Sequence, residues 1–461
     1  MKYTVLVNKD NKFKDSQFSK YNLISTKNEL DEDIEVEEEA YNHFLLLKEH
    51  LKELDIYIDI DDSFRSITSQ EEIYGDFLEN KGQEYCDKYV AVPGFSEHHT
   101  GLAIDIMLKV NDNYIRDNKD LLEFKDTFKK IHENLYKYGF ILRYPEDKES
   151  ITGYSYEPWH FRYVGEYPAK IMYENNLCLE EYLNSFGTVL YINKPKGITS
   201  FDVVNDISKK FGIKRVGHTG TLDPLATGVL IVTVGTACKI VELLTSEDKE
   251  YVACVELGYE TDTLDIDGEI IGECTVPKNL NIEKVLNSFK KTYIQEVPIY
   301  SAVKVDGKKL YEYARNNIEV ELPKKEVTIK EIELLEEEGN IFKFSCLVTK
   351  GCYIRSLIKD IGRELKVYAT MTDLVRTKQG NISLKDTNTI DSEFTLHTIT
   401  DVLDYDIIEV DDLLEKKISN GVKIENEFNI EDKVIFINKS NKLLGIYEVE
   451  DNYLKVWKNF A

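Results

Sequence analysis

The spacing of apolar and polar residues changes along this 461-residue chain and predicts both helices and strands. Apolar residues recur at helical spacing over residues 36–54 and 120–138, which predicts two amphipathic helices. Over residues 102–107 the apolar residues alternate with others instead, which is typical of a strand. The alternation places Asp105 on the opposite face from its apolar neighbours, where a carboxylate can face a cleft.

The second half of the chain reads mainly as strands. An apolar run occupies residues 229–234, and short alternating strands separated by turn residues follow Asp401. We therefore expect an α+β protein throughout, with a mixed, largely antiparallel sheet in this half. The expected domains are residues 1–183, 187–400 and 401–461.

Composition limits the classes of protein that fit. The formal net charge is −26, which argues against indiscriminate binding of nucleic acids. Seven cysteines without close pairs indicate neither a disulfide framework nor a cysteine zinc site. No apolar stretch reaches the length of a membrane span, and the first residues lack the apolar core of a secretion signal. We expect a cytoplasmic protein without membrane contact, whose oligomeric state the sequence leaves open.

A Gly- and Thr-rich turn presents one carboxylate. Residues 217–230 read GHTGTLDPLATGVL, in which Asp223 precedes Pro224. The proline fixes its own φ and restrains the residue before it, so Asp223 is held on a rigid turn. Alone, such an Asp-Pro pair is typical of a surface loop with a capping aspartate.

Five further sequence motifs, in a fixed order along the chain, accompany this turn. They are LYINKPKGITSFDVV (190–204), the Lys249-Glu250-Tyr251 segment before LGYETDTLDIDG, YSAVKVDGKKLYEYAR (300–315), KGCYIRSLIKDIG (350–362) and LVRT (374–377). Together with GHTGTLDPLATGVL, they resemble the bacterial tRNA pseudouridine synthases of the TruB family over roughly residues 187–461. The resemblance implies isomerisation of uridine 55 in the T-loop of tRNA, and a small PUA-like RNA-binding barrel over residues 401–461.

The reaction explains why a carboxylate is needed. Pseudouridine forms when the N1–C1′ bond of uridine breaks and the uracil rejoins through C5, so an electron-poor sugar carbon needs a carboxylate nearby. We assign this role to Asp223. Whether it attacks C1′ covalently or removes a proton from C2′ to give a glycal stays open. No redox change occurs, so we expect no cofactor for this half.

The target base must leave its stack, so the site must offer another stacking surface. Tyr251 is the candidate for that surface. By resemblance, Arg355 pairs with Asp223, His218 fills or props the space left in the RNA, and Leu374 packs on the base.

Basic residues near the candidate site suit the phosphates of a tRNA T-arm. They are Lys194, Lys209, Lys210, Lys214, Arg215, Lys304, Lys308 and Lys309. We include Lys194 among the substrate-binding residues. An alternative function is a non-catalytic tRNA-folding factor with a structural zinc-peptidase-like appendage, against which the intact Asp223 argues.

The first half holds a different set of chemical groups. SEHHTGLAID (96–105) and EPWHFRYVG (157–165) supply His98, Asp105 and His160 as candidate metal ligands. Two imidazoles and a carboxylate leave a fourth zinc position open, which is typical of a hydrolytic site, and Glu157 can then act as general base. His99 is expected to point away from this set, because neighbours in an extended segment face opposite ways.

The spacing S-x-H-x-x-G-x-A-x-D followed by E-x-W-H resembles the VanY-type D-alanyl-D-alanine carboxypeptidases. SFRS (63–66), YGFILRYPEDKESITGY (138–154) and LEEYL (179–183) also match. The resemblance implies a Zn²⁺-dependent peptidase acting on a small peptide or peptidoglycan precursor that ends in D-Ala-D-Ala. Arg65 then contacts the terminal carboxylate of the substrate.

Overall fold

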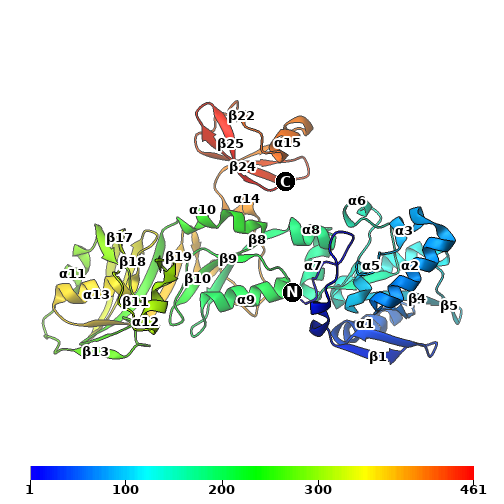
Figure 1. The fold of residues 1–461 in the computed structure, drawn as a ribbon. Helices are drawn as coiled ribbons and strands as arrows, with labels where there is room; N and C mark the ends of the chain where they lie inside the picture. Colours follow the sequence, from blue (N-terminus) through cyan, green and yellow to red (C-terminus); the bar gives the residue numbers. More distant parts are fainter. Residues whose placement is uncertain (1) are drawn as a thin grey trace. The chain divides into compact units, whose positions relative to one another are not determined.

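The computed structural model describes residues 2–461 (Figure 1). They divide into two compact units. The first ends at Phe186 and also includes Ile207–Arg215, and the second comprises Gly187–Asp206 and Val216–Ala461. Among the described residues, no helix combines the length and the apolar character needed to span a bilayer.

The first unit is built on a five-stranded antiparallel sheet in the order β3-β4-β7-β6, with β5 paired to β4. A separate antiparallel pair joins β1 and β2. The strands are β1 (Leu23–Lys27), β2 (Asp33–Glu37), β3 (Ile58–Asp62), β4 (Ala103–Val110), β5 (Asn113–Ile115), β6 (Phe140–Leu142) and β7 (His160–Tyr163). The α-helices are α1 (Glu38–Lys52), α2 (Ile67–Lys81), α3 (Gln83–Tyr89), α4 (Asn118–Leu121), α5 (Lys125–Leu135), α6 (Glu149–Thr152), α7 (Glu166–Glu174) and α8 (Leu179–Asn184). Short 3₁₀ turns are η1 (Asp15–Lys20), η2 (Glu97–Thr100) and η3 (Tyr136–Tyr138).

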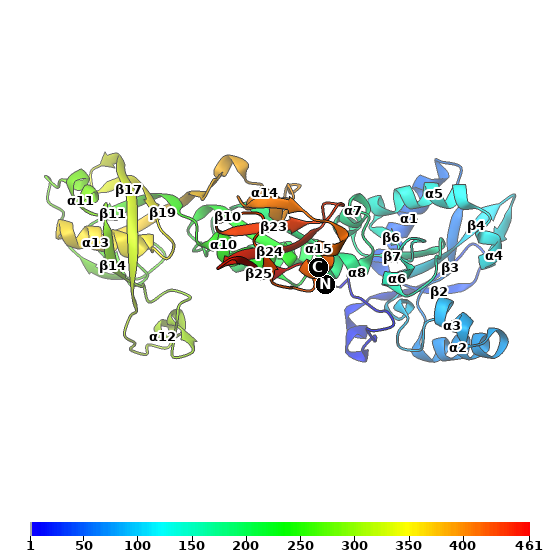
Figure 2. The same cartoon turned by 90° about the horizontal axis from the view of Figure 1, so that it is seen from above.

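The core of this unit lies between the sheet and the helices α1 and α5, which run alongside it in both views (Figures 1 and 2). Phe44 of α1 and Phe128 of α5 are buried against Ile104 of β4 and Phe161 of β7. The alternation predicted for β4 is present, because Ile104 joins the apolar core and Asp105 faces away from it. The sheet therefore carries Asp105 and His160 on strands anchored by a full hydrophobic core.

Two helix predictions differ from the structure at their ends. The helix expected over residues 36–54 is α1, and it begins later because the Glu37 side chain accepts a hydrogen bond from the backbone N–H of Ala40 and caps it. The helix expected over residues 120–138 is divided into α4, α5 and η3. Its chain leaves the helical path at Leu122, although the apolar spacing continues.

The second unit contains a nine-stranded sheet in the order β14-β17-β18-β11-β19-β10-β8, with β20 on β19 and β9 on β10. Only β10 and β19 pair in parallel among these described strands, so the predicted mixed, largely antiparallel sheet is confirmed. The strands are β8 (Gly187–Lys194), β9 (Val216–His218), β10 (Thr227–Gly235), β11 (Lys249–Leu257), β14 (Thr292–Glu296), β17 (Lys324–Glu338), β18 (Ile341–Val348), β19 (Ala369–Gln379) and β20 (Ile382–Ser383). Two further pairs are β12 (Tyr259–Thr261) with β13 (Ile270–Glu273), and β15 (Lys304–Val305) with β16 (Lys308–Lys309).

Most helices of this unit lie beside the nine-stranded sheet, and α15 lies beside the separate C-terminal strands (Figure 1). The helices are α9 (Ser200–Phe211), within which the division between the units falls, α10 (Val241–Thr245), α11 (Ile282–Ser288), α12 (Leu310–Arg315), α13 (Ile354–Leu365), α14 (Ile399–Val402) and α15 (Asp412–Ser419). The 3₁₀ turns are η4 (Thr236–Ile240) and η5 (Leu384–Asp386). Both units combine helices with sheets, which confirms the α+β class.

The last part of the chain forms a five-stranded sheet in the order β21-β23-β24-β25-β22. Its strands are β21 (Asp406–Glu409), β22 (Ile424–Glu425), β23 (Lys433–Ile437), β24 (Leu443–Glu450) and β25 (Tyr453–Asn459). The strand pairing of these described residues runs from β21 to β22 without closing, so the structure gives a half-barrel sheet where the sequence predicts a closed barrel. Ile435 and Ile446 of this sheet share a core cluster with Val189 of β8 and Ile231 of β10. The boundaries at 183/187 and 400/401 stay predictions.

Candidate functional site

The Asp223 turn links β9 to β10 and is anchored on both sides. The hydroxyl of Ser200 accepts a hydrogen bond from the backbone N–H of Leu222 (2.8 Å), and the carbonyl of Pro224 accepts one from Gly197 N–H (2.8 Å). The Asp223 side chain itself is about one-third exposed. The turn is therefore rigid while its carboxylate stays accessible.

Arg355 fixes that carboxylate from the first turn of α13. Its Nε lies 2.9 Å from Asp223 Oδ2, and its Nη1 and Nη2 donate to the carbonyls of Thr263 (2.8 Å) and Tyr300 (2.9 Å). The guanidinium is buried and all three of its nitrogens are engaged. Three fixed contacts hold the charge beside Asp223 in one orientation.

A cavity of about 120 Å³ opens next to this ion pair. Asp223, Arg355, Tyr251 and Leu374 all line it. Tyr251 comes from β11 and Leu374 from the neighbouring strand β19, so an aromatic and an aliphatic wall meet there. Burial raises the pKa of Tyr251, which keeps its phenol neutral. Four of the predicted site residues are thus brought together.

The other two predicted residues of this site lie differently. His218, on β9, does not line the cavity, and its Nδ1 accepts a hydrogen bond from Gly220 N–H (3.3 Å). Lys194 is fully buried, and its Nζ donates to the carbonyls of Pro195 (2.9 Å) and Ile198 (2.7 Å). Burial lowers the pKa of Lys194 to about 8. In this structure Lys194 supports the loop beside Asp223 and presents no surface to a phosphate.

Sequence reasoning missed Arg376. Its Nε donates to the carbonyl of Val229 (2.6 Å) and its Nη2 to that of Gly220 (3.1 Å), so it ties β19 to β10 and to the loop before Asp223. Arg376 follows Leu374 by two positions on the same strand and therefore shares its face. The two-residue repeat of a strand, applied from Leu374, is the sequence pattern that indicates Arg376.

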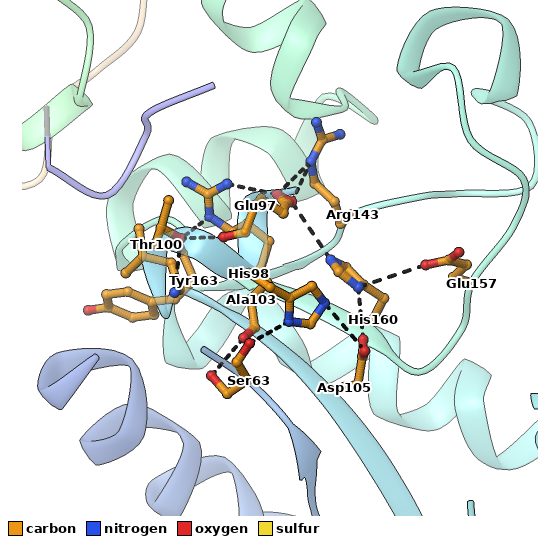
Figure 3. A network of polar contacts seen from close by, with 12 residues as sticks. Ser63, Glu97, His98, Thr100, Ala103, Asp105, Arg143, Glu157, His160 and Tyr163 are labelled. Carbon is orange, nitrogen blue, oxygen red and sulfur yellow. Dashed lines mark hydrogen bonds and ion pairs between the residues drawn. The ribbon is translucent and has the colours of Figure 1, made fainter. Parts of the chain in front are cut away.

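The three predicted metal ligands meet in the first unit (Figure 3). Asp105 and His160 are direct partners on β4 and β7, and Asp105 Oδ1 lies 2.8 Å from His160 Nδ1. His98, from η2, places its Nε2 3.3 Å from Asp105 Oδ2. One ligand atom of each residue lies within 4.8 Å of the others. The spacing and the N/O chemistry of these atoms fit a zinc ion.

The protonation of the two imidazoles also suits a cation. His98 Nδ1 must donate to the carbonyl of Ser63 (2.5 Å), which leaves a lone pair on the Nε2 that faces Asp105. His160 turns its Nδ1 toward Asp105 and its Nε2 toward the far side of the ring. The two carboxylate oxygens of Asp105 therefore face the two imidazoles, at 2.8 Å from His160 Nδ1 and 3.3 Å from His98 Nε2. This arrangement of donor atoms suits a cation at the centre of the cluster.

Glu157 and Arg65 line the same cavity, which has a volume of about 310 Å³. Glu157 Oε2 lies 3.7 Å from His160 Nδ1, and burial raises the pKa of Glu157 to about 8. Arg65 contacts Asp105 Oδ2 (2.9 Å) through Nη2 and Asp62 through Nε. The guanidinium therefore lies at the cluster, already paired with two carboxylates.

His99 lies outside the cluster, for a different reason from the one expected. Residues 97–100 form a 3₁₀ turn, so the prediction of an extended segment there is wrong. His99 Nδ1 donates to the carbonyl of Arg65 (2.7 Å), and its Nε2 accepts from Gly94 N–H (3.0 Å). Both ring nitrogens are used to hold loops around the site.

The two sites lie in parts of the chain that are similar to two different protein families. Residues 208–354 match the family model described as TruB family pseudouridylate synthase (N terminal domain), and residues 33–166 match that of D-alanyl-D-alanine carboxypeptidase, VanY. The tRNA pseudouridine synthase B of Fusobacterium nucleatum is 43% identical over 279 residues, covering 58% of this chain and 96% of that protein. The enzyme of Clostridium tetani is 41% identical over 275 residues, covering 58% and 93%.

The chain belongs to the TruB family. The TruB model covers Asp223 and Tyr251, and Arg355 and Leu374 follow it in the chain. The VanY match includes all of His98, Asp105, Glu157 and His160, so this TruB-family chain carries a carboxypeptidase-like part as well. A solved vancomycin-resistance D,D-pentapeptidase VanY in complex with Zn(II) is 30% identical, with a TM-score of 0.34, covering 40% of this chain and 100% of that one.

Proposed function

We propose that this TruB-family protein isomerises uridine 55 in the T-loop of tRNA and also carries a zinc-dependent D-alanyl-D-alanine carboxypeptidase. The observation that carries the first assignment is the Asp223–Arg355 ion pair on the wall of a cavity that Tyr251 and Leu374 also line. A carboxylate, a fixed counter-charge and a stacking surface are what the isomerisation needs.

In the proposed mechanism the uridine leaves its loop and stacks between Tyr251 and Leu374. Arg355 pairs with the Asp223 carboxylate and holds it in one orientation, and the carboxylate acts at the ribose while the N1–C1′ bond breaks. The uracil turns, C5 bonds to C1′, the C5 proton leaves and N1 takes one up, so the atoms balance without a cofactor. Covalent attack and the glycal route both begin from the same Asp223 carboxylate.

The RNA partner and the domain limits belong to this proposal. We assign residues 187–400 to the catalytic domain and residues 401–461 to a PUA-like RNA-binding domain that contacts the tRNA together with the T-arm site. The names of the TruB relatives support tRNA as the substrate. The strand-rich half-barrel sheet in the last part of the chain supports the second assignment.

Replacement of Asp223 by Asn tests the isomerase. The substitution keeps the shape and removes the charge, and we expect release of tritium from C5-labelled uridine in unmodified tRNA to fall by on the order of 1000-fold or more. Arg363→Lys, on the exposed side of α13, is the matched control and should retain activity. Absence of release from wild type as well, with tRNA binding retained, would favour a tRNA-folding factor instead.

The peptidase proposal is carried by the His98, Asp105 and His160 donor set. A bound zinc ion polarises the scissile carbonyl and acidifies water. Glu157 is placed to accept the proton of the attacking water and to pass it to the leaving amine of D-alanine. Arg65, at the same cavity, is our candidate for the terminal carboxylate of the substrate.

Metal analysis tests this second assignment. We expect about one zinc per chain, lost in His98→Ala and retained in His50→Gln, whose ring contacts Asn134 away from the cluster. Wild type should release D-alanine from a peptide ending in D-Ala-D-Ala. A chain that takes up no zinc and releases no alanine would remove the assignment.

A further inference from the structure

A cluster of four buried charged side chains lies behind His160. Arg143 Nε is 2.9 Å from Glu97 Oε1, and Arg162 Nη1 is 2.7 Å from Glu97 Oε2. The other two nitrogens of Arg143 contact both oxygens of Glu180, at 2.9 and 2.6 Å. Glu97, Arg143 and Arg162 are almost completely buried.

Such a cluster is not explained by stability alone. Removing charges from water is costly, and apolar side chains of similar volume stabilise an interior at least as well. Glu97 also has a neighbour outside the two arginines. Its Oε1 faces His160 Nε2 at 3.7 Å, on the opposite side of the ring from Asp105 (Figure 3).

The position and charge of Glu97 are tightly determined. Each carboxylate oxygen contacts a guanidinium, and Arg162 is held in turn by the carbonyls of Tyr3 (2.9 Å) and Val5 (2.8 Å). The His160 ring therefore meets a fixed negative charge.

The two imidazoles of the cluster face the centre with different nitrogens. His98 presents Nε2, because its Nδ1–H donates to the carbonyl of Ser63. His160 presents Nδ1, so its N–H must be on Nε2, an atom without a hydrogen-bond partner among residues 2–461. Ligating histidines commonly direct their second N–H at a carboxylate or carbonyl, which fixes the tautomer.

We propose that Glu97 is the positioning residue for His160, whose carboxylate keeps the proton on Nε2 and so directs the Nδ1 lone pair at the metal. Glu97 contacts neither substrate nor metal in this role. The inference depends on the zinc site proposed above. It assigns to Glu97 the function that the Ser63 carbonyl has for His98.

The test compares zinc affinity in three full-length variants, measured by competition with a chromophoric chelator. Glu97→Gln removes the charge, and Glu97→Asp keeps the charge but withdraws the carboxylate from His160. We expect both to weaken zinc binding by about 10- to 100-fold. Glu180→Gln is the matched control, because it breaks the same cluster through Arg143 and should bind zinc within about twofold of wild type.

A second measurement keeps the inference testable if a Glu97 variant does not fold. Nitrogen-15 NMR of selectively histidine-labelled, zinc-loaded wild type should show His160 protonated on Nε2. Protonation on Nδ1, or unchanged zinc affinity in both folded Glu97 variants, would overturn the role of Glu97 alone. Failure of wild type to bind zinc would overturn the metal site itself and this inference with it.

Discussion

Individual side chains in both sites are oriented by backbone carbonyls as much as by other side chains. Arg355 uses two of its nitrogens on Thr263 and Tyr300, and His98 uses Nδ1 on Ser63. Backbone acceptors move little, so these hydrogen bonds fix the orientation of each side chain and of its remaining nitrogen. For Arg355 that direction is the Asp223 carboxylate.

This arrangement predicts that lysine cannot replace Arg355. Lys carries the same charge but lacks the planar set of donors that contacts Asp223, Thr263 and Tyr300 together. We expect Arg355→Lys to lower kcat for tRNA isomerisation by about 100-fold, with little change in the Kd for tRNA. Single-turnover kinetics and filter binding measure the two quantities. Equal loss in Arg363→Lys would show a general effect on α13 and contradict the assignment.

The residue types at the sites could be read from sequence, but their partners could not. Asp223, Tyr251, Arg355 and Leu374 follow from ordered motifs, and the structure places them around one cavity. By contrast, Arg65 contacts Asp105 across 40 positions of sequence. Glu97 also looks like an ordinary acidic residue until the fold buries it between two arginines. Contacts of that range depend on the complete fold.

At the level of elements, the chain between His98 and Asp105 depends on a glycine at the end of η2. Gly101 has φ +68°, and a Cβ added there would lie 2.5 Å from Leu23 Cδ2 and 3.0 Å from the backbone nitrogen of Glu37. Its carbonyl also accepts a hydrogen bond from Glu37 N–H (3.0 Å). The glycine of the S-x-H-x-x-G-x-A-x-D spacing is therefore required because no larger residue fits at this position.

We accordingly expect Gly101→Ala to destabilise the first unit by about 1–3 kcal/mol, because the alanine is strained and must displace neighbouring backbone. The displaced turn should also weaken zinc binding about tenfold. Gly75→Ala is the control: Gly75 lies in α2 with no atom within 4 Å of an added Cβ, so a gain of about 0.5–1 kcal/mol is expected. Thermal unfolding and chelator competition measure both effects, and a Gly101→Ala protein as stable as wild type would contradict the steric argument.

Element boundaries were predicted less well than element types. Leu121, Phe124, Phe128, Ile131 and Leu135 keep helical spacing, and all five pack in or against the core of the first unit. The chain nevertheless leaves the helix between α4 and α5. Apolar spacing reports which face is buried and does not mark where a turn interrupts the backbone hydrogen bonds.

At the level of the whole molecule, the two candidate sites share no residue. His98, Asp105, Glu157 and His160 belong to the first unit, and the residues around Asp223 belong to the second. Each site has its own sheet and its own buried charges. The sequence predicted this separation because each set of motifs occupies its own stretch of the chain.

Removal of zinc should therefore act on one activity only. Chelation should abolish release of D-alanine and leave tRNA isomerisation within about twofold, because no isomerase residue lies in the metal cluster. At free zinc 100-fold above its Kd, binding contributes about 2.7 kcal/mol, so the first unit should melt about 5–10 °C lower without metal. Added zinc should restore both the melting temperature of the first unit and the peptidase activity.

The reciprocal variant, Asp223→Asn, should keep full zinc content and peptidase activity while losing isomerisation. A parallel fall of both activities on chelation would show that the metal site supports the isomerase, contrary to the separate residue sets.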